Sequence, residues 1–274
     1  MQGKTVLVTG GAKRVGAAIV RRLHAAGANV AIHCHSSLVE AKSLQAELNA
    51  KRPDSAYTVQ ANLLDTAALP HVVEKVVKHF GHLDAVVNNA SSFYPTPLDK
   101  ADEKQWNDLL GTNLKAPVFL AQAAAPELRR RHGCIVNIVD IHAEFPMHGH
   151  LLYNIAKSGL AGLTRALAQE LAPQVRVNGI SPGVSLWPEN AAWQDEEQRR
   201  KIVAHTLLKR EGEPDDIART VQFLIADAPY IPGRSSPWTA GAASTFKFSP
   251  NQPEPFALSL SKGRSWFDRH TNGY

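Results

Sequence analysis

The segment that decides the fold is Thr5-Val-Leu-Val-Thr-Gly-Gly-Ala-Lys-Arg-Val-Gly16. It opens with aliphatic and β-branched residues, the composition of a strand buried on both faces of a parallel sheet. A glycine turn follows, and an amphipathic helix is expected from residue 15. Such a turn lets the backbone approach a pyrophosphate, and the N–H groups at the helix start attract that anion. The spacing T-G-x-x-x-R-x-G therefore predicts a dinucleotide site, with an ordinary glycine turn as the alternative interpretation.

The rest of the chain alternates short apolar runs with longer amphipathic stretches. Strands are expected at residues 5–9, 29–32, 56–60, 84–87, 134–139 and 175–180, and helices at 15–27, 38–51, 67–80, 101–129, 151–171, 197–208 and 214–227. This alternation predicts a single α/β domain, a Rossmann-like doubly wound parallel sheet, over residues 1–233. Ligands bind such sheets at the carboxyl ends of the strands, where every motif considered below lies.

Composition excludes several classes of protein. The chain has 274 residues, of which 44% are hydrophobic and 20% charged, so wholesale disorder is excluded. The only cysteines, Cys34 and Cys134, cannot form a disulfide framework and favour a reducing cytoplasm. No apolar run is long enough for a membrane span, and no cluster has the spacing of a metal site. Of the net charge of +5, residues 234–274 supply +3, from five basic and two acidic residues. The remaining +2 gives no case for nucleic-acid binding.

The residues after the second strand bear on which dinucleotide binds. An acidic residue there would bind the ribose 2′-hydroxyl of NAD, but residues 33–37 read His-Cys-His-Ser-Ser. Arg14 and His35 suit a 2′-phosphate instead, with Ser36 or Ser37 as hydrogen-bond donors, because the guanidinium group is planar and always charged. This pattern favours NADPH. The alternative is that the histidines are ordinary solvated loop residues.

Tyr153 and Lys157 are four residues apart, on one face of an expected helix. A phenol with a pKa of about 10 is a poor acid at neutral pH, but a nearby ammonium group favours the phenolate. Such a pair beside a nicotinamide suits hydride transfer coupled to proton transfer. The spacing alone is weak evidence, because both residues are common on helices. It gains weight behind a phosphate turn, the Asn88-Asn-Ala90 segment and Asn113.

Taken together, residues 3–233 resemble a short-chain dehydrogenase/reductase. The matching motifs are T-G-x-x-x-x-x-G at Thr9–Gly16, N-N-A at Asn88–Ala90, the helical Asn113, Y-x-x-x-K at Tyr153–Lys157 and P-G at Pro182-Gly183. In that family a serine thirteen residues before the tyrosine polarises the substrate carbonyl, and here that position is Asp140. A carboxylate donates no hydrogen bond unless it is protonated, which speaks against ordinary ketone chemistry.

This departure points to one subfamily. Asp140, Arg14 and the segment Asn89–Leu98 together resemble the pteridine reductases. The resemblance implies that Arg14 lies near both cofactor and pterin, and that Ser91 and Phe93 contact the pterin. The ring of Phe93 and the nicotinamide would sandwich the substrate, since a flat heteroaromatic ring needs an aromatic partner. Plain core packing is the alternative role of Phe93.

The same resemblance implies how protons are delivered. Tyr153 and Asp140 would supply protons to the ring nitrogens, Lys157 would lower the pKa of Tyr153 and hold the ribose, and Asn113 would support the site. One departure is Ser36, where these enzymes often carry arginine. The expected cofactor contacts are Gly10, Arg14, Val15, Gly16, His33, His35, Ser36, Asn62, Leu63, Asn89, Ala90, Tyr153, Lys157, Pro182 and Gly183.

The expected function is therefore NADPH-dependent reduction of pterins or dihydropterins, with dihydrofolate as a further candidate. Two alternatives remain: a generic short-chain carbonyl reductase, and a catalytically inactive dinucleotide-binding protein. The family also implies a homotetramer. Trp187 lies in the loop after Pro182-Gly183 that closes over the substrate in this family, where it either shapes the pocket or anchors the loop.

Residues 234–274 depart from the family. A last strand with a pattern like Q-I-I-A-V-D-G-G-R-S is expected after Gly233, but the chain reads Arg-Ser-Ser-Pro-Trp-Thr-Ala-Gly-Ala-Ala. Codons for this stretch can be chosen that encode the family pattern in another frame, and Trp238-Thr239 must then yield Asp. We expect a frameshifted, poorly ordered tail that removes the last strand and impairs assembly. The alternative is a genuine divergent extension.

Overall fold

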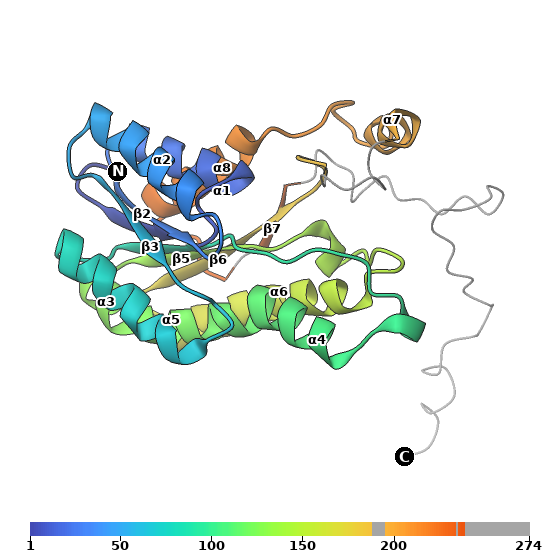
Figure 1. Cartoon of the computed structure of the whole chain (residues 1–274), viewed down its shortest axis with the longest axis horizontal. Helices are drawn as coiled ribbons and strands as arrows, with labels where there is room; N and C mark the ends of the chain where they lie inside the picture. Colours follow the sequence, from blue (N-terminus) through green and yellow to red (C-terminus); the bar gives the residue numbers. More distant parts are fainter. Residues whose placement is uncertain (188–194, 234, 239–274) are drawn as a thin grey trace, which may run out of the picture.

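The computed structural model describes residues 1–187, 195–233 and 235–238. At its centre lies a sheet of parallel strands in the order β3-β2-β1-β4-β5-β6-β7 (Figure 1). The strands are β1 (Thr5–Val8), β2 (Asn29–Cys34), β3 (Ala56–Gln60), β4 (Ala85–Asn88), β5 (Cys134–Ile138), β6 (Arg176–Pro182) and β7 (Ser235–Trp238). This order confirms the predicted Rossmann-like doubly wound fold. The strand order reverses between β1 and β4, which is where such sheets bind ligands.

Helices cover both faces of the sheet. One layer consists of α1 (Arg14–Ala25), α2 (Leu38–Lys51) and α8 (Pro214–Ala226), and the other of α3 (Leu69–Phe80), α5 (Ala116–Arg131) and α6 (Leu151–Leu171), with α4 (Glu103–Leu110) beside α6 (Figure 1). The helix α7 (Glu196–Ala204) lies apart from both layers. Short 3₁₀ turns span Thr66–Ala68, Leu98–Lys100 and Ile141–Ala143. Among the described helices, none is long and apolar enough to cross a membrane.

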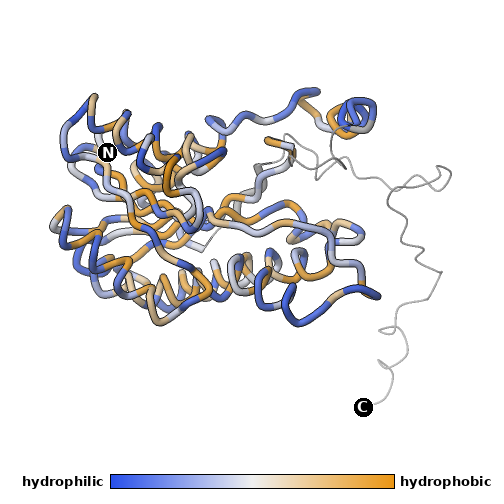
Figure 2. Tube along the Cα trace, viewed as in Figure 1, coloured by the Kyte–Doolittle hydropathy of each residue, from blue (hydrophilic) through white to orange (hydrophobic). Residues whose placement is uncertain are grey.

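Alternation along β1 explains why Val6, Leu7 and Val8 are all apolar. Val6 and Val8 enter the core under α1, α2 and α8, whereas Leu7 enters the core under α3 and α5, and all three side chains are fully buried. Apolar residues accordingly concentrate along the central strands (Figure 2). Because both faces of a parallel strand are covered, every side chain must be apolar, and this makes the strand readable from sequence.

The stretch 101–129, expected to be one helix, is interrupted. A π-helical turn, Gly111–Lys115, separates α4 from α5. The wider turn redirects backbone hydrogen bonds, and Nδ2 of Asn113 donates to the carbonyl of Leu109 at 2.9 Å. A β-carbon on Gly111 would lie 2.5 Å from a terminal methyl group of the exposed Leu64 side chain, so a larger residue here would displace that side chain. Such turns are frequent at functional sites because they reorient a side chain without ending the helix.

The expectation that the sheet loses its last strand is wrong for residues 235–238. These residues pair in parallel with β6, from Gly179 opposite Ser235 to Pro182 opposite Trp238. The hydrogen bonds between neighbouring strands join backbone groups, so a short strand such as β7 can pair without aliphatic side chains. β7 is also the edge of the sheet, where a proline such as Pro237 is tolerated because one side of the strand needs no partner. Residues 234 and 239–274, the rest of the expected aberrant tail, lie outside the described residues.

The frameshift interpretation predicts a gain in stability when the frame is restored. Replacing residues 234–243 by Gln-Ile-Ile-Ala-Val-Asp-Gly-Gly-Arg-Ser should raise Tm by at least about 5 °C, because each buried aliphatic side chain contributes roughly 1.5–3 kcal/mol. Calorimetry on both chains measures the difference. A control in which serine replaces both isoleucines and the valine of the new segment should gain nothing. Equal Tm values for the original and restored chains would contradict the interpretation.

Candidate active site

The glycine turn after β1 has the backbone geometry of an anion cradle. Gly10 has φ of 60°, which favours glycine, and a β-carbon on Gly16 would lie 2.1 Å from the carbonyl oxygen of Gly10. The turn leads directly into α1, whose first N–H groups have no partner within the helix. A pyrophosphate fits this arrangement, since the backbone is open where side chains would otherwise lie.

His33 supports the turn from inside the protein. Its Nδ1 accepts a hydrogen bond from the backbone N–H of Gly10 at 3.3 Å, and its Nε2 lies 3.2 Å from the carbonyl of Ala61, which can only accept. Nε2 therefore carries the proton. Burial lowers the pKa of His33 to about 4, so the imidazole is neutral. It fixes the shape of the turn and presents no charge to a phosphate.

Arg14 links the phosphate turn to the loop after β6. Its Nη2 donates to the carbonyl of Trp187 at 2.9 Å, across 173 positions in sequence. Trp187 is also held by its own Nε1, which donates to Glu211 at 2.7 Å, and by the guanidinium of Arg199, 5.4 Å from the ring centroid. Of the two roles considered for Trp187, these contacts show that it anchors the loop.

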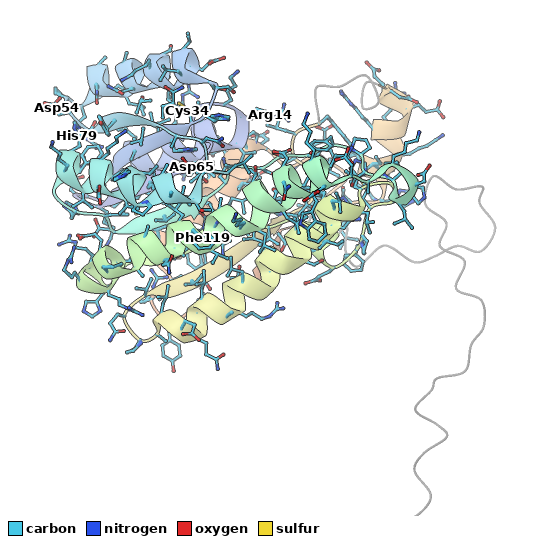
Figure 3. The ribbon with its side chains drawn as sticks, turned by 60° about the horizontal axis from the view of Figure 1, so that its bottom comes forward. Arg14, Cys34, Asp54, Asp65, His79 and Phe119 are labelled. Carbon is cyan, nitrogen blue, oxygen red and sulfur yellow. The ribbon has the colours of Figure 1, made fainter. Side chains whose placement is uncertain are left out.

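The carboxyl ends of the first strands lie together. Figure 3 shows Arg14, Cys34 and Asp65 toward one end of the sheet, with Asp54 and His79 toward the other. His35 and Ser36 are exposed immediately after β2.

The sequence analysis did not single out Lys13 at this edge. It forms an ion pair of 2.6 Å with Glu40 of α2, which begins just after Ser36. Its only sequence signal was its place beside Arg14.

The residues expected after the other strands have distinct environments. After β3, Asn62 is exposed and its Oδ1 accepts from the backbone N–H of Leu64 at 3.0 Å, whereas Leu63 is buried. Pro182 is buried at the end of β6, and Gly183 is half-buried.

The segment after β4 is tied to the glycine turn. Nδ2 of Asn89 donates to the carbonyls of Thr9 and Gly10, at 2.9 and 3.1 Å. The hydroxyl of Thr9 accepts from the backbone N–H groups of Asn89 and Ala90, at 3.0 and 3.1 Å. These four bonds join the ends of β1 and β4 at the point where the strand order reverses. They fix the segment Asn88–Ala90 as a backbone shelf beside the glycine turn, and Thr9 is the residue that holds this shelf.

Three of the expected catalytic side chains meet near the end of β5. The hydroxyl of Tyr153 donates to Oδ2 of Asp140 at 2.7 Å. The ammonium of Lys157 donates to the carbonyl of Ile138 at 2.9 Å and lies 5.6 Å from the centroid of the Tyr153 ring. Tyr153 and Lys157 are 5% and 3% exposed, so their charges are poorly screened by water.

The electrostatics of this group differ from the sequence-based expectation. Burial raises the pKa of Tyr153 well above its ordinary value, and the Asp140 carboxylate adds to the rise. Burial also lowers the pKa of Lys157 to about 8, partly opposed by Asp140. The spacing of Tyr153 and Lys157 suggested a lowered phenol pKa instead. Burial is the main reason, and the hydrogen bond to the Asp140 carboxylate further holds the phenol in the protonated form.

Ser91 and Asn113 complete the polar part of the site. The Ser91 hydroxyl donates to Oδ1 of Asn113 at 2.6 Å, and Nδ2 of Asn113 donates to the carbonyl of Ser92 at 3.0 Å. Ser91 lies close enough to the phenol to oppose part of the rise in the pKa of Tyr153. The π-helical turn thus positions Asn113, and Asn113 positions the serine next to Tyr153.

An aromatic cluster borders Tyr153. The half-buried ring of Phe93 meets the ring of Tyr153 edge-on, with centroids 4.8 Å apart and planes at 80°. Its other neighbour is His150, stacked at 4.9 Å and 11°. Phe93 therefore lies beside the phenol, a position compatible with substrate contact and with the alternative role in packing. His150 gave no sequence signal, because it is an isolated residue before a helix. Among the described residues, no group of three or more His, Cys, Asp or Glu side chains is arranged to hold a metal ion.

Known proteins resemble this chain over most of its length. A family model described as Enoyl-(Acyl carrier protein) reductase matches residues 10–242. Pteridine reductase 1 of Leishmania tarentolae is 39% identical over 268 residues, covering 83% of this chain and 92% of the relative. A 3-oxoacyl-(acyl-carrier-protein) reductase of Staphylococcus aureus is 35% identical over 235 residues, covering 85% and 95%. An uncharacterised oxidoreductase of Methylorubrum extorquens is 33% identical over 230 residues, covering 83% and 92%.

These matches agree with the glycine turn, the Asn88-Asn-Ala90 shelf and the Tyr153/Lys157 pair, and the pteridine reductase is more similar than the 3-oxoacyl reductase. The chain belongs to the short-chain dehydrogenase/reductase family, whose members are oxidoreductases that bind a nicotinamide dinucleotide.

Proposed function

We propose that this protein reduces pterins or dihydropterins with NADPH, with dihydrofolate as a further candidate. The observation that carries the proposal is the 2.7 Å hydrogen bond between the Tyr153 hydroxyl and the Asp140 carboxylate. Reduction of a C=N bond requires a proton at nitrogen, and this pair holds one between two oxygens. The likeness to a pteridine reductase, at 39% identity, supports the same assignment.

Proton delivery follows from the pair. The phenol proton lies on Oη of Tyr153 and points at Oδ2 of Asp140, so it moves along that bond only as the Asp140 carboxyl gives a proton to a ring nitrogen made basic by reduction. A protonated carboxyl is a donor, whereas the ionised form only accepts. Asp140 can therefore hand the proton to a basic ring nitrogen. When bound, the cofactor supplies the hydride for the carbon atom.

Lys157 assists from behind the ring. Its ammonium lies 5.6 Å from the centroid of Tyr153, so it favours the negative charge that appears when the phenol proton leaves. With its pKa lowered to about 8 by burial, the group is still mostly charged at neutral pH. Its bond to the Ile138 carbonyl fixes the position of this charge. The resemblance to the family further implies that Lys157 holds the ribose.

Phe93 supplies the surface for a flat substrate. One face of the ring is covered by His150, so a substrate ring would lie on the opposite face. Ser91, which bonds to Asn113 at 2.6 Å, presents a hydroxyl beside the same position. An aromatic face next to a proton-holding pair is the arrangement that a heteroaromatic C=N substrate needs.

The choice of NADPH rests on the residues around the end of β2. Residues 33–37 contain no acid to bind a ribose 2′-hydroxyl, and His35 and Ser36 are exposed there. Arg14 adds a cation at the start of α1, whereas the charge of neighbouring Lys13 is balanced by Glu40. A 2′-phosphate carries the charge that complements the Arg14 guanidinium.

A 3-oxoacyl reductase is the second candidate, favoured by the relative at 35% identity and by the description of the family model. It is the more specific form of the carbonyl reductase considered above. Asp140 speaks against it, since a ketone oxygen needs a donor and this carboxylate accepts from Tyr153. The assembled Asp140, Tyr153 and Lys157 speak against an inactive dinucleotide-binding protein.

The homotetramer expected from the family remains part of the proposal. Two large aromatic side chains are exposed on consecutive helices of one layer, Trp106 on α4 at 46% and Phe119 on α5 at 37%. Figure 3 labels Phe119. Exposed aromatic residues of this size are typical of surfaces that other subunits cover.

Removing the phenol hydroxyl should abolish catalysis. Tyr153→Phe is expected to lower kcat for a dihydropterin by at least about a hundredfold, because it removes the proton donor. The matched control is Tyr94→Phe, which breaks a similar bond of 2.9 Å to Asp108 outside the reacting pair. The kcat of each variant is measured from steady-state oxidation of NADPH. Near-wild-type turnover in Tyr153→Phe would show that the proton comes from elsewhere.

Exchanging the carboxylate should change the substrate. Asp140→Ser should lower the rate of pterin reduction at least about tenfold and increase reduction of simple ketones, because a hydroxyl donates to a carbonyl oxygen. The rates with one pterin and one ketone are compared in both proteins. If pterin reduction is unchanged, Asp140 has only a structural role.

The cation at the phosphate turn should distinguish the two dinucleotides. Arg14→Ala is expected to raise the Kd of NADPH about 10- to 100-fold, as for loss of a charge-assisted hydrogen bond, with a smaller effect on NADH. Loss of the contact between Arg14 and Trp187 would weaken the binding of NADPH and of NADH equally. The ratio of the two Kd changes therefore reports the interaction of Arg14 with the 2′-phosphate alone. Arg21→Ala, on the same helix but paired with Glu47, is the control. Equal losses would assign Arg14 to the pyrophosphate or the substrate.

A further inference from the structure

His150 is a buried polar residue at the edge of the active site that the proposed chemistry does not use. It precedes α6, lies three positions before Tyr153 and is 8% exposed. Its imidazole is nearly parallel to the ring of Phe93, with centroids 4.9 Å apart and planes at 11°. This is the offset-stacked arrangement, in which part of one ring extends past the edge of the other.

The hydrogen bonds of the imidazole fix its chemistry. Nδ1 lies 3.0 Å from the carbonyl of His148, and because a carbonyl only accepts, Nδ1 carries the proton. Burial lowers the pKa of His150, which keeps the ring neutral. Nε2 is therefore a bare acceptor. It is withdrawn from solvent, and no donor from the described part of the chain reaches it.

A buried acceptor without a donor is costly, and native proteins retain few of them. If stacking behind Phe93 were the whole role of His150, an apolar ring would serve without this cost. The unused lone pair of Nε2 therefore points to a ligand that carries a hydrogen-bond donor. The imidazole of His150 covers one face of the Phe93 ring, and the substrate ring would lie on the other face. Only a substituent of the substrate that extends past the edge of the Phe93 ring can therefore reach the imidazole.

We propose that His150 is a substrate-recognition residue whose Nε2 accepts a hydrogen bond from a hydroxyl or N–H group on the side chain of a pterin. This inference rests on the proposed function and narrows its substrate class. Pterins with a donor-bearing side chain are selected over pterins with a plain alkyl group. The acceptor is fixed in place, because the His148 carbonyl holds Nδ1 and Phe93 holds the plane of the ring.

Two substrates that differ by one hydroxyl test the proposal. The Kd values of 6-hydroxymethyl- and 6-methyl-dihydropterin are measured by titration calorimetry in the presence of oxidised NADP. Wild type should bind the hydroxymethyl compound about tenfold more tightly, as for one buried hydrogen bond. His150→Phe keeps an aromatic ring and removes the acceptor, so the two Kd values should become equal. His148→Phe, which keeps the carbonyl and alters an exposed side chain, should retain the tenfold preference.

The outcomes separate the two claims. Equal binding of both compounds by wild type, or a preference that survives in His150→Phe, would overturn the recognition role while leaving pterin binding intact. If wild type binds neither compound, the proposed function fails together with the recognition role. His150→Leu removes the same acceptor in a smaller side chain and replaces the phenylalanine variant should that variant not fold.

Discussion

Parallel pairing of β1 with β4 is the constraint on which the site depends. It places the glycine turn next to the Asn88–Ala90 segment, and the hydroxyl of Thr9 joins the two through the N–H groups of Asn89 and Ala90. The same pairing extends through β5 and β6, so the residues that follow each strand reach one edge. Residues far apart in sequence thereby form a cradle for an anion beside a group of buried ionisable side chains.

Burial strengthens the electrostatic interactions among Asp140, Tyr153 and Lys157. In water, phenol, carboxylate and ammonium would interact weakly, but around Tyr153 the field of Asp140 is poorly screened. The carboxylate keeps the phenol protonated, and Lys157 is positioned to favour its ionisation once the proton moves. A serine at position 140 would provide a donor to a carbonyl, whereas the aspartate provides a place to hold a proton. The proposed substrate class thus rests on one side chain more than on the fold.

Much of this arrangement could be predicted from local sequence, because strands covered on both faces must be apolar and the glycine turn has few alternatives. What could not be predicted depends on distances across the fold. The raised pKa of Tyr153 depends on its burial and on the 2.7 Å approach of Asp140. The contact of Trp187 needs a partner 173 positions away, and the unusual environment of His150 depends on its stacking with Phe93. The strand β7 escaped prediction because backbone pairing at a sheet edge does not require aliphatic side chains.

The central claim is that the Asp140–Tyr153 pair serves reduction of a heteroaromatic C=N bond. The most direct measurement is NADPH oxidation by the full-length wild-type protein against matched panels of dihydropterins and simple ketones, including a 3-oxoacyl ester. The account predicts turnover of dihydropterins with kcat/KM at least about a hundredfold above that of any ketone. Efficient reduction of the ketones without reduction of any pterin would contradict it.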